Sequence, residues 1–320
     1  MNVSVLGCGR WGSFIGWYLS SFGHNVIQWG EEGRKSFEVL KDYGKNEYVK
    51  LNSNIELTSD LSLAVSKSEI IVISISAQCL RDFLKSKLCK YKLDEKVVCL
   101  CMKGLEAETG KRLTEVAIEC GIKSDNLAVW VGPGHIQSFL AGQPNCMVID
   151  SSNPNVVKLL ADGFRSELIR FYYGDDIIGS EVGAAAKNVI GIAAGMLDGG
   201  DYETLKGPLM ARGAREISRL IKAMGGKELT AYGLCHLGDY ETTLFSKYSN
   251  NRKFGEDFVK GNGFEKLAEG VSTTKALKLL GEKYQVDLPI VNAVYSIIYE
   301  NQEPMQVFMK VFSRTTRKEF

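Results

Sequence analysis

A glycine-rich turn near the N-terminus constrains the fold more than any other feature of the 320-residue sequence. An apolar run from Val3 to Leu6 leads directly into a GxGxxG motif, and residues 13–22 have a helical pattern. A second apolar run follows from Asn25 to Trp29. Strand, turn, helix and second strand in this order are typical of a βαβ unit with two parallel strands.

Each glycine of the motif has its own structural reason. Gly7 permits a tight turn, Gly9 lets the backbone approach a pyrophosphate, and Gly12 lets the helix pack closely on the strand. The helix N-terminus then offers free N–H groups to an anion. We therefore expect NAD or NADP to bind here, with Arg10 and Trp11 as further cofactor contacts. A glycine-rich turn without a ligand is the alternative.

The residues after the second run leave the choice between NAD and NADP open. An acidic residue in this region normally accepts the ribose hydroxyls of NAD, and Glu31 or Glu32 can take that role. However, Gly30 stands at the usual acidic position, and Arg34 is suited to the additional phosphate of NADP. We predict NAD, with NADP as the alternative and with Glu31 and Arg34 as contacts.

The two halves of the chain differ in pattern. Short β-rich runs alternate with helical patterns in the first half: Val3 to Leu6, Asn25 to Trp29, Ile70 to Ile75, Lys96 to Cys101, Leu127 to Val131, Cys146 to Asp150 and, as an extension, Ile169 to Tyr173. This alternation predicts an α/β domain at residues 1–178, a Rossmann-type doubly wound sheet of parallel strands. From about Gly179 only helical periodicity remains, which predicts an all-α substrate-binding domain at residues 179–320.

Composition restricts the classes of partner. The chain has 39 Lys and Arg against 38 Asp and Glu, so no overall charge favours nucleic acid or an anionic membrane. It shows no basic leader with a cleavage site and no uninterrupted apolar stretch of roughly 18 residues, so we expect a cytoplasmic protein without a membrane span. Eight cysteines without a CxxC pair, and three histidines, give no indication of a metal site.

One lysine interrupts a helical pattern that otherwise consists of small and aliphatic residues. At helical spacing Gly183, Lys187, Gly191 and Ala194 share a face, which leaves room for a ligand beside the ammonium. The alternative is a lysine whose stem lies in a close helix contact while its charge reaches solvent. Lys103 follows a strand of buried type, where a parallel sheet presents residues to a ligand, or else belongs to a solvated loop.

Further motifs follow in a characteristic order along nearly the whole chain: the glycine turn at residues 7–12, Lys103-Gly104-Leu105-Glu106, Gly132-Pro133, Lys187-Asn188, residues 233–239, residues 268–271 and residues 299–304. In this combination the sequence resembles the NAD(P)-dependent glycerol-3-phosphate dehydrogenase family. The resemblance implies interconversion of sn-glycerol 3-phosphate and dihydroxyacetone phosphate, in the supply of glycerophospholipid precursors. It implies a small phosphorylated substrate, and the helical half is a candidate homodimer interface.

The resemblance also implies residue roles. Lys187 exchanges a proton with the C2 hydroxyl, for which it has to lose its charge more readily than a solvated lysine, through desolvation and neighbouring positive charge. Lys103 and Asp239 are further catalytic candidates, and Asp239 is alternatively a helix cap. Substrate contacts are expected at Lys103, Gly132, Gly134, His135, Asn188, Ser249, Asn250, Asn251 and Arg252. Further cofactor contacts are expected at Lys103, Ile136, Asn250 and Glu269.

The sequence departs from the family pattern around the ligands. Asn250 replaces a common arginine, and the loss of a charged contact costs roughly 2 kcal/mol unless Arg252 or Lys253 compensates. Gly134 and His135 replace a usual serine and phenylalanine, and His135 either binds the substrate phosphate or fills the space of the phenylalanine.

A third departure from the family pattern, at residues 74–78, changes residues that are expected to line the cofactor site. Two other functions therefore remain open. One is a related dehydrogenase that acts on a modified glycerol phosphate or another hydroxy compound, and the other is a non-enzymatic dinucleotide-binding protein.

Overall fold

The computed structural model describes residues 1–315 and residue 319. Contacts between Cα atoms divide the chain into two compact units, which we describe separately. The sheet unit comprises Met1–Lys103 and Arg112–Glu181, and the helical unit comprises Gly104–Lys111 and Val182–Phe320. The domain boundary predicted from the sequence lies after residue 178 and therefore assigns Gly104–Lys111 to the first domain. In the structure this short segment packs in the helical unit, with residues that follow it by more than seventy positions in the sequence.

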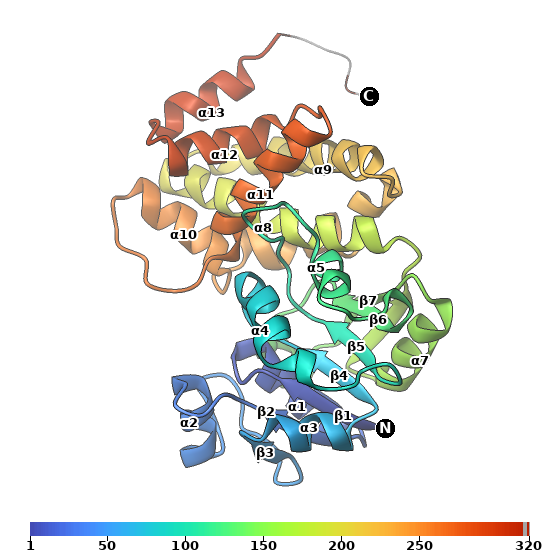
Figure 1. Cartoon of the computed structure of the whole chain (residues 1–320). Coiled ribbons are helices and arrows are strands. Elements are labelled where there is room, and N and C mark those ends of the chain that lie inside the picture. Colours follow the sequence, from blue (N-terminus) through green and yellow to red (C-terminus); the bar gives the residue numbers. More distant parts are fainter. Residues whose placement is uncertain (316–318, 320) are drawn as a thin grey trace. The chain divides into compact units, whose positions relative to one another are not determined.

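The sheet unit contains one eight-stranded sheet with the order β3-β2-β1-β4-β5-β6-β7-β8 (Figure 1). Its strands are β1 (Asn2–Leu6), β2 (Asn25–Trp29), β3 (Glu56–Thr58), β4 (Ile70–Ile73), β5 (Val97–Leu100), β6 (Leu127–Val131), β7 (Asn145–Asp150) and β8 (Ile169–Tyr173). The order runs outward in both directions from β1 and β4, which is the doubly wound arrangement. The predicted fold class, a Rossmann-type sheet followed by helices, is confirmed.

Two details of the strand prediction were wrong. The three-residue edge strand β3 was missed, because a run this short carries no periodic signal. In addition, β7 pairs antiparallel with β6, whereas all strands were expected to be parallel. The connection between them contains only the five-residue helix α6 (Ile136–Leu140), whose rise of about 7.5 Å is too short to return the chain along the strand.

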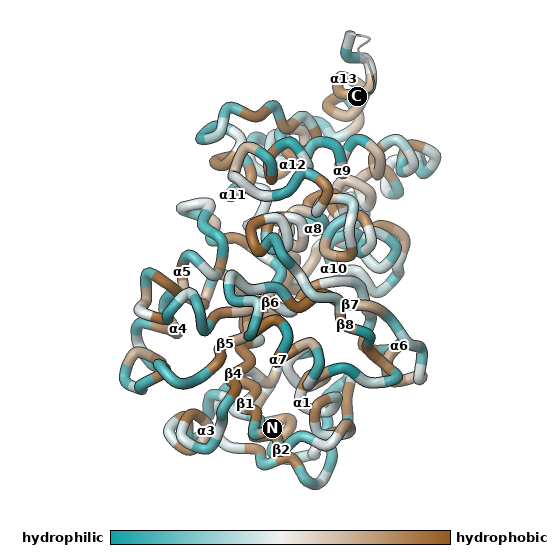
Figure 2. Tube along the Cα trace, turned by 90° about the vertical axis from the view of Figure 1, so that its right-hand side faces the viewer, coloured by the Kyte–Doolittle hydropathy of each residue, from teal (hydrophilic) through white to brown (hydrophobic). Residues whose placement is uncertain are grey.

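Helices cover both faces of the sheet. The sheet unit contains α1 (Arg10–Ser21), α2 (Lys35–Tyr43), α3 (Leu61–Lys67), α4 (Leu80–Ser86), α5 (Leu113–Glu119), α6 and α7 (Pro154–Phe164). Val3 and Val5 belong to the same apolar cluster as Phe14 of α1. The side chain between them, Ser4, donates a hydrogen bond of 2.6 Å to the carbonyl oxygen of Ala64 in α3. Because successive side chains of a strand point to opposite faces, α1 and α3 lie on opposite faces of β1. Figure 2 shows the apolar residues along the central strands.

The helical unit is built from α8 (Ile177–Gly199), α9 (Lys206–Ala223), α10 (Asn250–Val259), α11 (Glu269–Lys283), α12 (Pro289–Tyr299) and α13 (Pro304–Phe312). No strand occurs among its described residues, so the predicted all-helical second half is confirmed. Helix α8 is long and apolar enough to cross a membrane by composition alone, but 89% of its most apolar window is buried inside the protein. Residues 179–197 of this helix are all buried.

Candidate active site

The glycine turn after β1 has the geometry that a phosphate-binding turn requires. Gly7 has a φ of +129°, and a Cβ added there would lie 2.2 Å from the carbonyl oxygen of Ser74, which follows β4. A Cβ on Gly12 would lie 2.1 Å from the carbonyl oxygen of Gly7. Both positions therefore exclude side chains, because the backbone of β1, α1 and β4 is packed too closely around them.

Gly9 differs from the other two glycines. It is exposed and immediately precedes α1, and a Cβ added there would meet no atom within 4 Å. No atom therefore fills the space beside Gly9, and the first N–H groups of the helix that follows it have no partners within the helix. This open cradle at a helix N-terminus fits the pyrophosphate of a dinucleotide, which is an anion that these N–H groups can bind.

Three predicted ligand contacts come together at the carboxyl ends of β1, β5 and β6. Lys103 donates a hydrogen bond of 2.5 Å to the carbonyl oxygen of Gly132. Its ammonium also lies 5.8 Å from the ring centroid of Trp11. The indole Nε1 of Trp11 is buried and has no hydrogen-bond partner, so it is a donor that a bound ligand can satisfy.

The segment after β6 explains one departure from the family pattern. A Cβ on Gly134 would lie 2.3 Å from a ring carbon of Phe139 in α6, so a serine at this position would require that ring to move. His135 is half-buried and immediately precedes α6. The side chain of Ile136 is 1% exposed and packs in the core of the sheet unit, so the structure does not present it to a cofactor.

Lys187 lies in a buried polar cluster within the helical unit. Its Nζ is 2.8 Å from Oδ2 of Asp239 and donates a hydrogen bond of 2.7 Å to Oγ1 of Thr243. Thr243 in turn donates to the carbonyl oxygen of Asp239 at 2.8 Å. Asp239 has no exposed surface, and the side chain of Lys187 is only 8% exposed. The cluster can therefore hold an ammonium in one orientation.

Sequence reasoning missed Thr243 and expected different neighbours for Lys187. The spacing of four residues between Asp239 and Thr243 was the available signal. Asp239 ends a 3-10 helix (Leu237–Asp239), and Thr243 lies within the π-helix that follows it (Glu241–Phe245). A neighbouring positive charge was expected beside Lys187, but the structure places the carboxylate of Asp239 there. An opposite charge at this distance stabilises the ammonium, which is the form that donates a proton.

The two glycine positions on the face of α8 that carries Lys187 are packed against protein. A Cβ on Gly191 would lie 2.7 Å from Cγ2 of Thr243, and one on Gly183 would lie 3.0 Å from Cβ of His236. The side chains of Thr243 and His236 thus occupy the space at these two glycines, which was expected to be part of the room for a ligand. The glycines instead let the segment at residues 236–243 approach the helix closely enough to contact Lys187.

Asn188 connects α8 to the start of two other helices. Its Oδ1 accepts a hydrogen bond of 3.0 Å from Nδ2 of Asn251 in α10. Oδ1 of Asn251 accepts one of 2.9 Å from the backbone N–H of Gly270, which follows Glu269 at the start of α11. Hydrogen bonds thus link Asn188 to Asn251, both predicted substrate contacts. They also link Asn251 to the residue after Glu269, which is a predicted cofactor contact.

The turn that begins α10 is shaped by its own hydrogen bonds. The side chain of Ser249 accepts a hydrogen bond from the backbone N–H of Arg252 and so caps the helix. Asn250 donates from Nδ2 to the carbonyl oxygen of Leu267 at 3.1 Å. Asn250 thus ties α10 to the loop before α11, and an uncharged amide suits that contact.

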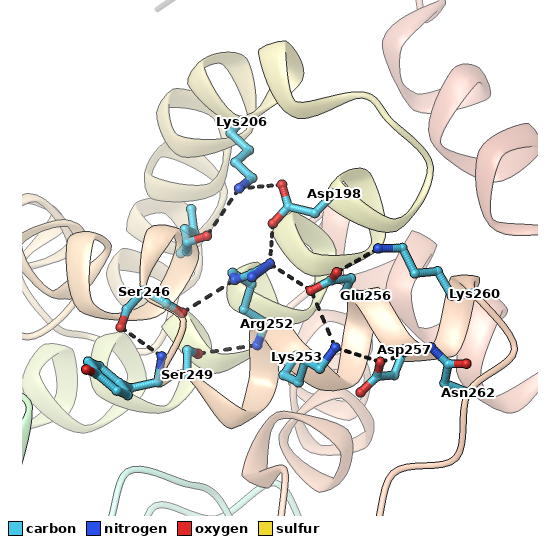
Figure 3. A network of polar contacts seen from close by, with 12 residues as sticks. Asp198, Lys206, Ser246, Ser249, Arg252, Lys253, Glu256, Asp257, Lys260 and Asn262 are labelled. Carbon is cyan, nitrogen blue, oxygen red and sulfur yellow. Dashed lines mark hydrogen bonds and ion pairs between the residues drawn. The ribbon is translucent and has the colours of Figure 1, made fainter.

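Arg252 lies in a network of ion pairs that joins α8, α9 and α10 (Figure 3). Its guanidinium is 2.6 Å from Asp198 and 3.1 Å from Glu256, and Lys206 also contacts Asp198 at 2.5 Å. Lys253, the other candidate, lies 2.9 Å from Asp257. Both cations are already paired with carboxylates, so the structure does not support the predicted compensation for Asn250.

A buried histidine supports the same helix one turn before Lys187. Nδ1 of His236 lies 2.8 Å from the carbonyl oxygen of Gly183, and Nε2 lies 2.7 Å from the hydroxyl of Tyr240. Burial lowers the pKa of His236 to about 4. The imidazole is therefore neutral at physiological pH. Its hydrogen bonds connect α8 to the segment that carries Asp239.

Comparison with known proteins places these features in one family. The description "NAD-dependent glycerol-3-phosphate dehydrogenase N-terminus" matches residues 2–157, and the corresponding C-terminal description matches residues 176–309. The chain is 34% identical to an NAD(P)+ glycerol-3-phosphate dehydrogenase of Chlorobium phaeobacteroides over 100% of this chain and 99% of that protein. It is 33% identical to an enzyme of the same name from a Thermoanaerobacter species, again over 100% and 99%.

A solved structure agrees with this similarity. The crystal structure of glycerol-3-phosphate dehydrogenase from Coxiella burnetii superimposes with a TM-score of 0.90 at 26% sequence identity. The match covers 98% of this chain and 99% of that one.

Proposed function

We propose that this chain, which belongs to the NAD-dependent glycerol-3-phosphate dehydrogenase family, interconverts sn-glycerol 3-phosphate and dihydroxyacetone phosphate. The reaction oxidises the C2 hydroxyl of glycerol 3-phosphate to a ketone. The nicotinamide of NAD or NADP supplies the hydride chemistry when it is bound. The protein residues bind and orient the reactants and move the hydroxyl proton.

The buried cluster of Lys187, Asp239 and Thr243 carries this proposal. In the direction of reduction, Nζ of Lys187 donates a proton to the C2 carbonyl oxygen of dihydroxyacetone phosphate as C2 accepts the hydride. In the direction of oxidation, the neutral amine takes the proton of the C2 hydroxyl. Asp239 and Thr243 hold Nζ in place, which reduces the reorganisation needed for proton transfer.

The other residues are proposed to bind the ligands. The open cradle at Gly9 would hold the pyrophosphate of the dinucleotide, and the buried Nε1 of Trp11 offers a further donor. Lys103 is proposed as a contact of both cofactor and substrate, since its ammonium is held at the carboxyl end of β5. Asn188 and Asn251 are proposed to orient the substrate in the helical unit.

A test of this function follows NADH and NADPH oxidation in the presence of dihydroxyacetone phosphate. We compare the natural sequence with Lys187→Ala and with Lys206→Ala, which removes a similarly buried lysine that is also paired with an aspartate. We expect turnover that Lys187→Ala reduces by at least about a thousandfold and that Lys206→Ala largely retains. Retained binding of NADH by Lys187→Ala would show that the loss concerns chemistry.

The alternatives have separate outcomes in the same assay. Turnover with another carbonyl compound, but none with dihydroxyacetone phosphate, would identify a related dehydrogenase. Binding of NADH without turnover on a panel of carbonyl compounds would identify a dinucleotide-binding protein. Full activity of Lys187→Ala would contradict the proposed role of Lys187 in proton transfer but not the proposed reaction.

Three wider assignments also belong to the proposal. The reaction would supply glycerol 3-phosphate as a precursor of glycerophospholipids, in the cytoplasm. A homodimer would form through the helical unit, and the exposed apolar side chains of Met309 and Phe312 on α13 are consistent with such an interface. Sedimentation of the natural sequence and of Met309→Lys would test it, since a monomeric natural chain contradicts it.

A further inference from the structure

A cluster of ion pairs at the end of β2 has no part in the proposed proton transfer. Glu31 lies two residues beyond β2, and each of its carboxylate oxygens accepts a hydrogen bond from a different cation. Lys87 binds Oε1, and Nε of Arg34 binds Oε2 at 3.1 Å. Lys87 lies at the end of α4, 56 residues further along the chain, so no local pattern indicates this contact.

The packing beneath β2 explains why the carboxylate is at residue 31. A Cβ on Gly30 would lie 2.6 Å from Sγ of Cys8 and 2.5 Å from a ring carbon of Phe37. The thiol of Cys8 is buried, and burial raises its pKa to about 12, so it acts as an uncharged packing group. A side chain at residue 30 is thus excluded, and Glu31 is the first position after β2 that can carry an acid.

Lys87 has a fixed place in this cluster. Its ammonium lies 5.9 Å from the ring centroid of Trp29, the last residue of β2, and its side chain is 35% exposed. The indole and the carboxylate of Glu31 therefore hold it beside the carboxyl end of β2. In dinucleotide-binding folds this end of the second strand adjoins the adenosine ribose.

The cluster contains both kinds of group that distinguish NAD from NADP. A carboxylate here accepts the ribose hydroxyls of NAD, whereas a cation here binds the 2′-phosphate of NADP. The hydrogen bonds from Lys87 and Arg34 lower the pKa of Glu31, so its carboxylate is charged at neutral pH. A phosphate that approaches these two cations would meet that negative charge and would have to displace it.

We propose that Glu31 selects NAD(H) over NADP(H) because its carboxylate occupies the Lys87–Arg34 cation pair that would otherwise bind the 2′-phosphate. The proposal rests on the proposed function, since it requires a nicotinamide dinucleotide at the glycine turn. A carboxylate oxygen accepts more than one hydrogen bond, so Glu31 can accept the ribose hydroxyls of NAD while it stays paired with both cations. With NADP the same pairing has to break.

Direct binding measurements test this selection independently of catalysis. Dissociation constants of NADH and NADPH are measured by fluorescence titration for the natural chain, Glu31→Gln, and Glu31→Gln combined with Lys87→Met. The control is Glu56→Gln, which removes the same charge from an exposed glutamate that pairs with Lys67 at 3.3 Å in the same sheet. Competition by 2′,5′-ADP against ADP probes the 2′-phosphate alone.

We expect the natural chain to bind NADH at least about tenfold more tightly than NADPH. Glu31→Gln should strengthen NADPH and 2′,5′-ADP binding by about tenfold, and this gain should shrink at high salt. Adding Lys87→Met should remove most of the gain, and Glu56→Gln should leave both affinities within about twofold. A preference for NADPH in the natural chain, or unchanged NADPH binding in Glu31→Gln, would overturn the proposal.

The two proposals fail in different ways. Normal turnover of dihydroxyacetone phosphate with no effect of Glu31→Gln on coenzyme preference contradicts only the role of Glu31. The expected change in nucleotide affinity without turnover of dihydroxyacetone phosphate contradicts only the proposed reaction. A natural chain that binds neither nucleotide would overturn both.

Discussion

Lys187 and Asp239 form an ion pair of 2.8 Å in which the carboxylate has no exposed surface. A charge buried to this extent requires its partner, because the lost hydration is otherwise not replaced. We predict that Lys187→Met lowers the free energy of unfolding by about 3–5 kcal/mol. Lys187→Met combined with Asp239→Asn should recover a large part of this loss. Chemical denaturation measures both values, and equal stability of the single and double variants would contradict the prediction.

Thr243 should affect catalysis more than folding. Thr243→Val keeps the shape of the side chain but removes the hydroxyl that contacts Nζ of Lys187 at 2.7 Å. We expect kcat to fall by roughly tenfold to a hundredfold, since Lys187 loses one of the groups that orient it. The affinity for NADH should stay unchanged.

The matched control for Thr243 is Thr274→Val. Thr274 is equally buried, and its hydroxyl donates to the carbonyl oxygen of Gly270 in α11. Steady-state kinetics of the two variants separate a role at Lys187 from the general cost of removing a buried hydroxyl. A similar fall in kcat for both variants would show that Thr243 has no specific role.

The glycine turn allows a comparison between folding and ligand binding. Gly12→Ala introduces a Cβ 2.1 Å from a backbone oxygen, so it should lower Tm by several degrees. Gly9→Ala meets no atom within 4 Å and should leave Tm nearly unchanged. The new methyl group would nevertheless stand in the proposed pyrophosphate cradle, and we expect NADH binding to weaken at least about tenfold. Normal NADH binding by a folded Gly9→Ala variant would place the pyrophosphate elsewhere.

Glu216 should give stability a specific pH dependence. It is 1% exposed, and its carboxylate accepts hydrogen bonds from the backbone N–H groups of Ile290 and Val291 at the start of α12. Burial raises its pKa from 4.5 to about 7. Folding therefore favours the protonated carboxyl, so the stabilisation is fully present below about pH 4.5 and is lost as pH rises through about 7.

The variant Glu216→Gln isolates this effect. The free energy of unfolding of the natural chain should fall relative to that of the variant by about 3 kcal/mol between pH 4.5 and pH 8. The lost hydrogen bond of the variant adds an offset that does not depend on pH. Denaturation curves at four or five pH values measure the difference, and a difference that is constant with pH would contradict the raised pKa.

The glycine turn and the positions of the early strands along the chain were predictable because their signals are local. Gly7, Gly9 and Gly12 specify a turn between adjacent elements, and the apolar runs around them specify strands that pair with near neighbours. The helical second half was predictable for the same reason, since periodicity within a segment reports which face is buried. Lys187 was conspicuous as the one lysine in a helical segment that otherwise consists mostly of small and aliphatic residues.

The partners of these residues depended on the tertiary structure. The contacts of Lys187 with Thr243 and of Glu31 with Lys87 join residues that are 56 positions apart in the sequence. The packing of Gly104–Lys111 in the helical unit is likewise non-local.

The class of fold, the glycine turn and the identity of the candidate lysine could thus be predicted from the amino-acid sequence, because turns and amphipathic segments are encoded by neighbouring residues. The side chains that surround this lysine and the cations that pair with Glu31 became known only from the folded protein. The contacts between distant residues instead follow from the packing of the whole unit, to which every segment contributes.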